Sequence, residues 1–272
     1  MPRLKVFTWN MQRGASISEK NSISNSEYTQ KAQARLKLLT KLCEDHDVGF
    51  ITEAGKDLSD AIDTPNTTSV LLPKGQGYWN VAEKEGTQDL KAGCRCLLFC
   101  KGIAESRKIN FYSGKLKASR YPAAATNDDV LLVSFHATSG GGGGDNINSL
   151  VERLVDGVGP NLIHPNHYKL VIIGGDFNSN RSFISQPKKN THQSPNGSGA
   201  ILDGFFCTHR MGSDSRIKIT IEPKIFRSHP KDGFGGGNFS TGWWTALNNN
   251  LFMRVSDHAP VSAVIEYEHH DH

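Results

Sequence analysis

The order of apolar and polar residues along the chain predicts strands that end in polar residues. The clearest case is Leu170–Ile173, an apolar run with almost no alternation, which is typical of a strand covered on both faces of its sheet. The run should end at Gly174 and Gly175, and Asp176 and Asn178 follow directly. Because α/β proteins keep their chemistry just beyond strand ends, we expect a functional site here. A plain Asp/Asn turn is the alternative for this segment taken alone.

The same pattern predicts the other elements of the chain. Strands are expected at residues 4–11, 48–52, 78–82, 94–100, 109–112, 123–126, 130–135, 201–208, 216–221 and 262–267. The helical spacing of apolar residues predicts an amphipathic helix over Tyr28–Asp45, and a second helix is expected to follow Asp145 and to include Leu154 and Val155. Strands and helices are intermixed without a repeat or a composition break, so we predict a single domain, residues 1–272, with its core at about residues 4–267.

Composition permits several partners and demands none. With 272 residues and 37% hydrophobic content the chain can bury a sizeable core. The net charge of +4 allows an anionic partner without requiring one. No apolar run reaches the ~18 residues that span a bilayer, and residues Met1–Lys5 show no signal-peptide features.

The five cysteines indicate core packing and no metal or disulfide pattern. Cys94, Cys96 and Cys100 would lie on one face of a strand, where small thiols are usually buried. Because the count is odd, at least one thiol has no partner within the chain.

Polar residues at the predicted strand ends form one candidate site. They are Asn10, Glu53, His136, Asp176, Asn178, Asp203, Asp257 and His258. Carboxylate and carboxamide oxygens suit a hard divalent cation such as Mg²⁺, whereas two imidazoles suit proton transfer or stabilisation of phosphate charge. Zinc fits less well, because carboxylates outnumber imidazoles and no His-Glu-x-x-His motif is present. A single histidine at a strand end is more often structural, but one site explains all eight residues, and it predicts metal-assisted phosphoester hydrolysis.

Seven short motifs occur in an order that resembles a known superfamily. They are Thr8-Trp9-Asn10, Glu53 after a short strand, Ser119-Arg120-Tyr121-Pro122, Phe135-His136, Gly175-Asp176-Phe177-Asn178, Ile201-Leu202-Asp203 and Ser256-Asp257-His258-Ala259-Pro260-Val261. This order is similar to the endonuclease/exonuclease/phosphatase superfamily typified by DNase I. Within it, the segments 139–141, 148–150 and 198–203 are most similar to the active subunit of cytolethal distending toxin. The resemblance covers about Leu4 to Tyr267.

The resemblance implies a fold and a metal site. The fold would be a four-layer α/β sandwich, with two packed mixed β-sheets flanked by helices and the active site at one edge. Glu53 would hold the metal, helped by Asn10 and Asp257. The cation would be Mg²⁺, or another divalent cation such as Mn²⁺ or Ca²⁺.

The resemblance also implies roles for the remaining residues. Asp176 would align or deprotonate the attacking water. His258 would be oriented by Asp203, and the carboxylate favours the protonated ring. His136 would stabilise the transition state or protonate the leaving oxygen. Two residues would contact phosphate, namely Asn178 and Arg120.

The function implied is a metal-dependent DNA endonuclease that acts as a genotoxin-like nuclease. Its partners would be DNA and toxin delivery subunits, and its location that of a secreted toxin or effector acting in a host nucleus. A phosphatase acting on phosphoinositides or inositol phosphates is the alternative within the superfamily. A binding module without catalysis is a third, against which the complete set of catalytic residue types argues. The His-rich segment Glu266–His272 is expected to be a solvated tail that can bind metals adventitiously.

Overall fold

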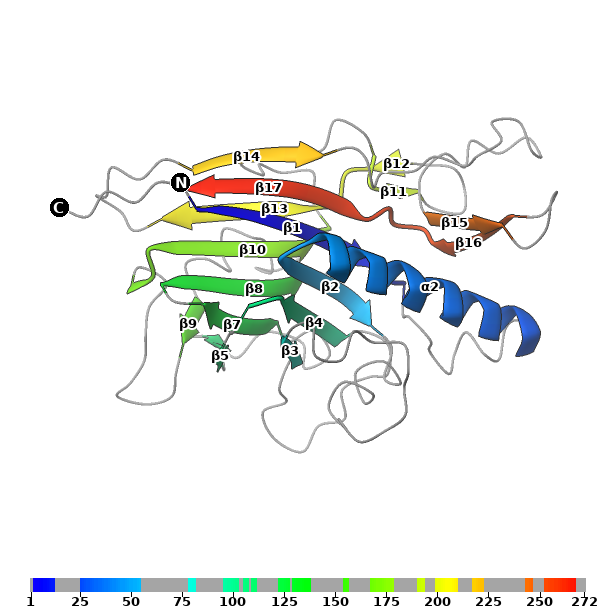
Figure 1. Ribbon diagram of the computed structural model, residues 1–272, viewed down its shortest axis with the longest axis horizontal. Helices are drawn as coiled ribbons and strands as arrows, with labels where there is room; N and C mark the ends of the chain where they lie inside the picture. Colours follow the sequence, from blue (N-terminus) through cyan, green and yellow to red (C-terminus); the bar gives the residue numbers. More distant parts are fainter. Residues whose placement is uncertain are drawn as a thin grey trace.

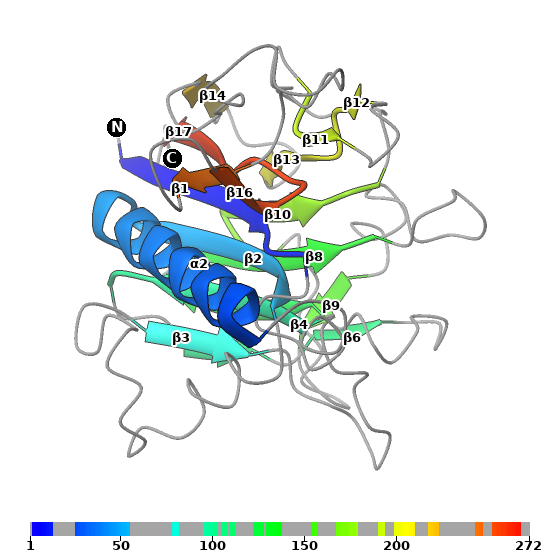
Figure 2. The same cartoon turned by 90° about the vertical axis from the view of Figure 1, so that its right-hand side faces the viewer.

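The described part of the chain contains one long helix and two main β-sheets. The computed structural model describes residues 2–12, 25–54, 78–81, 95–102, 105–107, 109–111, 122–127, 129–137, 154–156, 167–178, 190–193, 199–209, 217–222, 243–246 and 252–267. The helix, α2, spans Asn25–Asp45 and lies against one outer face of the stacked sheets (Figures 1 and 2). None of the described helices is long and apolar enough to cross a membrane.

Each main sheet is mixed, with one parallel pair near its middle. The larger sheet has six strands, in the order β14 (Ile217–Glu222), β17 (Val261–Tyr267), β1 (Arg3–Asn10), β2 (Val48–Ala54), β4 (Arg95–Cys100) and β3 (Tyr78–Val81). The smaller has five, in the order β13 (Asp203–His209), β10 (Leu170–Asp176), β8 (Val130–His136), β7 (Ala123–Asn127) and β5 (Glu105–Arg107). The pairs β1–β2 and β8–β10 are parallel, so all four strands end at the same side of the molecule (Figure 1).

Three short two-stranded sheets complete the described strands. They are β11 (His192–Gln193) with β12 (Gly199–Ala200), β15 (Trp243–Ala246) with β16 (Phe252–Ser256), and β6 (Ile109–Phe111) with β9 (Leu154–Asp156). The first of these pairs touches the candidate site through an isolated bridge between His192 and His258, and β16 of the second pair ends at Ser256, just before Asp257 and His258.

Alternating side chains divide the interior into layers. The inner faces of the two sheets meet in an apolar cluster, where the rings of Phe50 and Phe205 lie edge to face with centroids 6.1 Å apart. The outer face of the six-stranded sheet packs on α2 through Trp9, Leu39 and Leu42, among others. The outer face of the five-stranded sheet is buried as well. The α/β sandwich predicted from the sequence is therefore confirmed.

The predicted strands agree with the observed ones within a few residues, with two corrections. The strand at Leu170 does not end at the glycines but continues through Gly174 and Gly175 to Asp176. The glycines allow neighbouring parts of the chain to approach β10 closely. A Cβ on Gly174 would enter the Phe50 ring, and one on Gly175 would collide with the backbone carbonyl of Phe135.

The second correction concerns the helix expected after Asp145. Its last residues, Leu154 and Val155, form β9, which pairs with β6, so strand pairing overrides the helical spacing there. Residues 138–153, which include the rest of that helix and the glycine run, lie outside the described residues. The expected core cysteines are confirmed for Cys96 and Cys100, while Cys94 also lies outside them.

Replacing Gly175 by alanine should destabilise the protein strongly. The added methyl group would force β10 away from β8, and we expect a loss of about 2 kcal/mol or more in the free energy of unfolding. Chemical denaturation measures this loss. The matched control is Gly199→Ala, where the three atoms nearest to the methyl group all belong to the side chain of exposed Asn190, which can move aside, and a change below about 0.5 kcal/mol is expected. Equal stability of both variants and the parent would contradict the close approach.

Candidate active site

The candidate site lies at the side of the molecule where the parallel strands end. Strands β1, β2, β8 and β10 bring their carboxyl ends there. The antiparallel strands β13 and β17 begin at the same side, so Asp203 and the segment before Val261 arrive beside them. This side faces the viewer in Figure 2.

The two-residue period of each strand explains why the polar residues point between the sheets. In β10, Ile172 and Gly174 face the inner core, and Asp176 is next in the same row. The row of Val6 ends with Asn10, that of Leu132 with His136, and that of Phe205 with Asp203. Each of these four apolar rows of the inner core therefore leads to a polar residue of the candidate site.

Glu53 departs from this period. It follows Ile51 by two residues, and Ile51 belongs to the outer layer beneath α2. The backbone of Glu53 has a φ of 51°, and the β2–β4 register is irregular between Ile51 and Ala54. This local irregularity breaks the alternation, and Glu53 Oε1 lies 3.6 Å from His136 Nε2.

Asp176 lies at the centre of the site. Its Oδ2 accepts a hydrogen bond from Asn10 Nδ2 at 2.9 Å, and its Oδ1 accepts one from the backbone N–H of Asn178 at 2.9 Å. The same Oδ2 lies 3.6 Å from His136 Nε2 and 3.8 Å from His258 Nε2. The carboxylate thus has two imidazoles near one of its oxygens and accepts two hydrogen bonds.

Asp203 orients His258. Its Oδ2 lies 2.7 Å from His258 Nδ1, which makes Nδ1 the protonated nitrogen of the pair and turns Nε2 toward Asp176. The backbone is fixed too, since Trp9 Nε1 donates to the His258 carbonyl at 3.2 Å and Ser256 Oγ accepts from the His258 N–H at 3.1 Å. Asp203 and His258 are both buried.

Burial and neighbouring charges shift two pKa values in the site. Burial, reinforced by the charge of Asp203, raises the pKa of Asp176 to about 7, against the lowering effect of His258 and the two hydrogen bonds. Burial alone would lower the pKa of His258, but the charge and hydrogen bond of Asp203, with the charges of Asp176 and Asp257, raise it to about 10. At neutral pH the site therefore holds a carboxyl group near its titration midpoint beside a protonated imidazole.

Asp257 is connected to the other residues through Gln12 and His258. Its backbone N–H donates to Gln12 Oε1 at 3.1 Å, and the Gln12 N–H donates to Asn10 Oδ1 at 2.8 Å. The φ of Gln12 is 52°, so this residue is held in an unusual conformation just after β1. The sequence alone did not single out Gln12.

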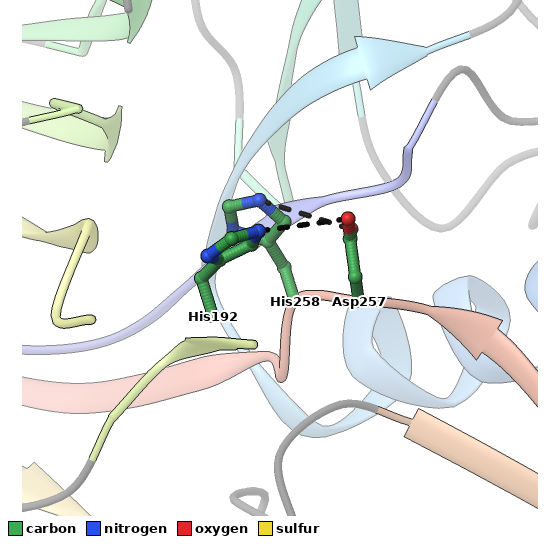
Figure 3. A group of neighbouring side chains, drawn as sticks. All are labelled: His192, Asp257 and His258. Carbon is green, nitrogen blue, oxygen red and sulfur yellow. Dashed lines mark ion pairs between the residues drawn. The ribbon is translucent and has the colours of Figure 1, made fainter. Parts of the chain in front are cut away.

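His192 is a second residue that sequence reasoning missed. It lies outside every strand and helix expected from the sequence, and its ring centroid is 4.6 Å from that of His258. Its Nε2 lies 3.6 Å from Asp257 Oδ2 (Figure 3). The preceding residue, buried Thr191, accepts the N–H groups of Leu202 and Asp203 at 2.9 and 3.0 Å. A two-residue strand leaves no periodic signal, so no pattern in the sequence identifies these residues.

The donor set suits a hard divalent cation. Glu53 and Asp257 offer carboxylate oxygens at partly exposed positions, and Asn10 Oδ1 keeps a second lone pair beside its bond to Gln12. Oxygen donors with two negative charges fit an ion such as Mg²⁺. The cation itself is not identified by these residues.

All but one of the predicted site residues are therefore brought together. Asn178 lies beside Asp176, and its Nδ2 donates to the Ala137 carbonyl at 2.7 Å, which leaves a second N–H for a ligand. Arg120 lies outside the described residues, so its predicted phosphate contact stays a prediction.

Comparisons with solved structures give the same fold. The crystal structure of D. rerio TDP2 with single strand DNA product is 10% identical and has a TM-score of 0.55, with 98% of this chain and 100% of that chain covered. Cytolethal distending toxin from Actinobacillus actinomycetemcomitans is 19% identical, with a TM-score of 0.51 and coverage of 96% and 97%. An endonuclease/exonuclease/phosphatase family protein from Leptotrichia buccalis is 14% identical, with a TM-score of 0.52 and coverage of 97% and 99%. At these identities the likeness shows the fold alone.

Sequence comparison gives the family. No curated protein sequence matches the chain. The sequence profile of the Endonuclease/Exonuclease/phosphatase family matches residues 7–263, which confirms the resemblance stated above. Members of this family are divalent-metal-dependent hydrolases of phosphoester bonds. The chain therefore belongs to the Endonuclease/Exonuclease/phosphatase family.

Proposed function

We propose that this protein is a metal-dependent endodeoxyribonuclease that hydrolyses phosphodiester bonds of DNA. The observation that carries the proposal is that two imidazoles lie near the same oxygen of Asp176, with His136 Nε2 at 3.6 Å and His258 Nε2 at 3.8 Å. A base flanked by two proton-donating or cationic groups is what in-line hydrolysis of a phosphoester needs. A binding module would have no use for this arrangement.

Asp176 is the proposed base. As water attacks phosphorus, the carboxylate accepts a water proton, and its pKa of about 7 suits this transfer at neutral pH. Asn10 and the Asn178 N–H hold the two carboxylate oxygens in place, so little reorganisation is needed when the proton moves.

His258 and His136 act on the phosphate. Protonated His258, held by Asp203, directs its Nε2–H toward the reacting group and stabilises the negative charge that develops there. The bond from phosphorus to the leaving oxygen then breaks, and that oxygen receives a proton from His136. Asp203 contacts the reacting atoms only through His258, so it is a positioning residue.

Glu53, with Asn10 and Asp257, would hold the divalent cation. When bound, the ion supplies a Lewis acid that neutralises phosphate charge. The second N–H of Asn178 is placed to bind a phosphate oxygen, and Arg120 is the proposed second phosphate contact.

One observation favours DNA as the substrate: the similar TDP2 structure was obtained with a single strand DNA product. The net charge of +4 is compatible with any anionic substrate. The same metal chemistry would serve a phosphatase of phosphoinositides or inositol phosphates, so the substrate test has to include both classes. The genotoxin-like role, the delivery subunits and the secreted location stay predictions.

The purified protein should nick supercoiled plasmid in the presence of Mg²⁺. Nicking should stop when EDTA removes the cation, and His136→Ala should reduce the rate by about 100-fold or more, because a general acid is lost. Gel electrophoresis of the plasmid measures the conversion. His167→Gln is the matched control, since this exposed histidine lies just before β10, at the end of the strand opposite to Asp176.

Other outcomes of this test distinguish the alternatives. If the protein releases phosphate from an inositol phosphate faster than it nicks plasmid DNA, the phosphatase replaces the nuclease as the proposed function. No hydrolysis of either substrate by the folded protein, with Mg²⁺, Mn²⁺ or Ca²⁺, would contradict both.

Asp203→Asn should reduce kcat by about 1,000-fold with little effect on KM. The amide cannot compensate the positive ring, so the pKa of His258 should fall from about 10 toward 6.5. NMR titration of the imidazole in EDTA measures this shift directly. A variant with an unchanged His258 pKa and normal kcat would show that the pair has no such role.

The pH dependence of kcat/KM should be bell-shaped. Activity requires ionised Asp176, which is present above its pKa of about 7, and protonated His258, which is present below its pKa of about 10. A bound cation moves the acidic limb below 7 by favouring the carboxylate. Rates measured from pH 5 to 11 at saturating metal test this, and activity that keeps rising beyond pH 11 would contradict the role of protonated His258.

A further inference from the structure

Two imidazoles face one carboxylate beside the proposed oxygen site. His192 Nε2 lies 3.6 Å from Asp257 Oδ2, and His258 Nε2 lies 3.8 Å from Asp257 Oδ1 (Figure 3). Their ligand atoms all lie within 4.8 Å of one another. We propose that His192, Asp257 and His258 form a separate site for a transition-metal ion such as Zn²⁺ or Co²⁺.

The donor types favour a transition metal over Mg²⁺. Imidazole nitrogen suits Zn²⁺ and Co²⁺, whereas Mg²⁺ prefers oxygen ligands only. Glu53 and Asn10, which have only oxygen donors to offer, suit the other class of ion. The two classes of ion would therefore bind mainly through different ligands. Only Asp257 would belong to both sites.

The distances are close to those of a tetrahedral site. Zn–N and Zn–O bonds near 2.1 Å place neighbouring ligand atoms about 3.4 Å apart. His192 Nε2 lies 3.6 Å from Asp257 Oδ2 and His258 Nε2 lies 3.8 Å from Asp257 Oδ1, and the three ligand atoms lie within 4.8 Å of one another. Side-chain rotations would bring these atoms to the spacing of a bound ion, and water or a phosphate oxygen would complete the coordination.

The ring of His258 is already oriented for such an ion. Asp203 binds Nδ1 at 2.7 Å, so Nε2 is the nitrogen directed at Asp257, and a metal ion there would displace its proton. A carboxylate behind a metal-binding imidazole fixes the ring and strengthens the ligand. Asp203 gives His258 this support without any movement.

Backbone hydrogen bonds hold His192 beside His258. The Thr191 carbonyl accepts the Ala259 N–H at 2.8 Å, and the Thr191 N–H donates to Ala200 at 2.9 Å. Thr191 is fully buried, so His192 extends from a rigid support. The side chains of His192 and Asp257 remain 20% and 18% exposed, which gives an ion access from solvent.

An ion in this site would occupy His258 Nε2 and Asp257, and it would therefore inhibit hydrolysis. This consequence rests on the proposed function, whereas the binding itself does not. Binding and inhibition are therefore measured separately.

The binding test is a Co²⁺ titration followed by visible absorption, without Mg²⁺. All proteins carry His269→Ser, His270→Ser and His272→Ser, so that the His-rich end does not contribute. We expect saturation at one equivalent and the intense bands of four- or five-coordinate Co²⁺. His192→Gln should weaken the apparent Kd by about tenfold or more, because a ligand is lost. His167→Gln should leave it unchanged.

An unchanged Kd in His192→Gln, or an equal loss in His167→Gln, would overturn the site. If circular dichroism shows that His192→Gln is unfolded, His192→Asn decides in the same way, because His192 belongs to the proposed transition-metal site and is not among the oxygen ligands of the other cation. The alternative is that Asp257 only forms ion pairs with the two histidines and that no metal binds. The parent protein would then show no saturable Co²⁺ absorption, and this result would also overturn the proposed site.

Inhibition is tested by plasmid nicking at fixed Mg²⁺ and increasing Zn²⁺. His192→Gln should need about tenfold more Zn²⁺ for half-inhibition than the parent or His167→Gln. Equal inhibition of all three would overturn the inhibitory role and leave the Co²⁺ result standing. If no substrate is hydrolysed at all, the proposed function fails, while the Co²⁺ titration still decides whether the site exists.

Discussion

The packing of the two sheets against each other sets the geometry of the active site. Asn10 and Glu53 come from the six-stranded sheet, and His136, Asp176 and Asp203 from the five-stranded one. The hydrogen bond from Asn10 to Asp176 therefore spans the gap between the sheets, as does that from Ser134 Oγ to the Ile51 carbonyl at 3.0 Å. Because protein interiors are close-packed, the side chains that fill this gap also fix the distances between catalytic groups. Stability and function share one core.

The buried charges of the site can be tolerated because they balance one another. Asp176 and Asp203 are both buried, which would be costly for two isolated carboxylates. His258 lies near both, at 3.8 and 2.7 Å, and its positive charge offsets theirs. The two carboxylates then differ in role, since Asp203 holds the ring of His258 while Asp176 is the proposed base. Environment separates two chemically identical residues.

The period of the strands predicted the main strands and the polar residues of the site, whereas the sandwich of two sheets was implied by the resemblance to the superfamily. An apolar row that ends in Asn10, His136, Asp176 or Asp203 is readable without coordinates. Three features were not readable. The bulge that re-aims Glu53, the two-residue strand that carries His192, and the use of Gly175 for close approach all depend on partners distant in the chain. The helix expected at Leu154 failed for the same reason, since pairing with β6 overrides local spacing.

The position of β17 in the sheet has a consequence for the protein during its synthesis on the ribosome. This strand is the last in the described chain, yet it lies between β14 and β1, inside the larger sheet. Until β17 has been translated, the edge of β1 that pairs with it has no partner strand. Asp257 and His258 lie just before this strand in the sequence. A chain that ends before this segment would lack two of the proposed site residues and would expose a strand edge that can pair with another chain. The segment that completes the larger sheet therefore also completes the proposed site.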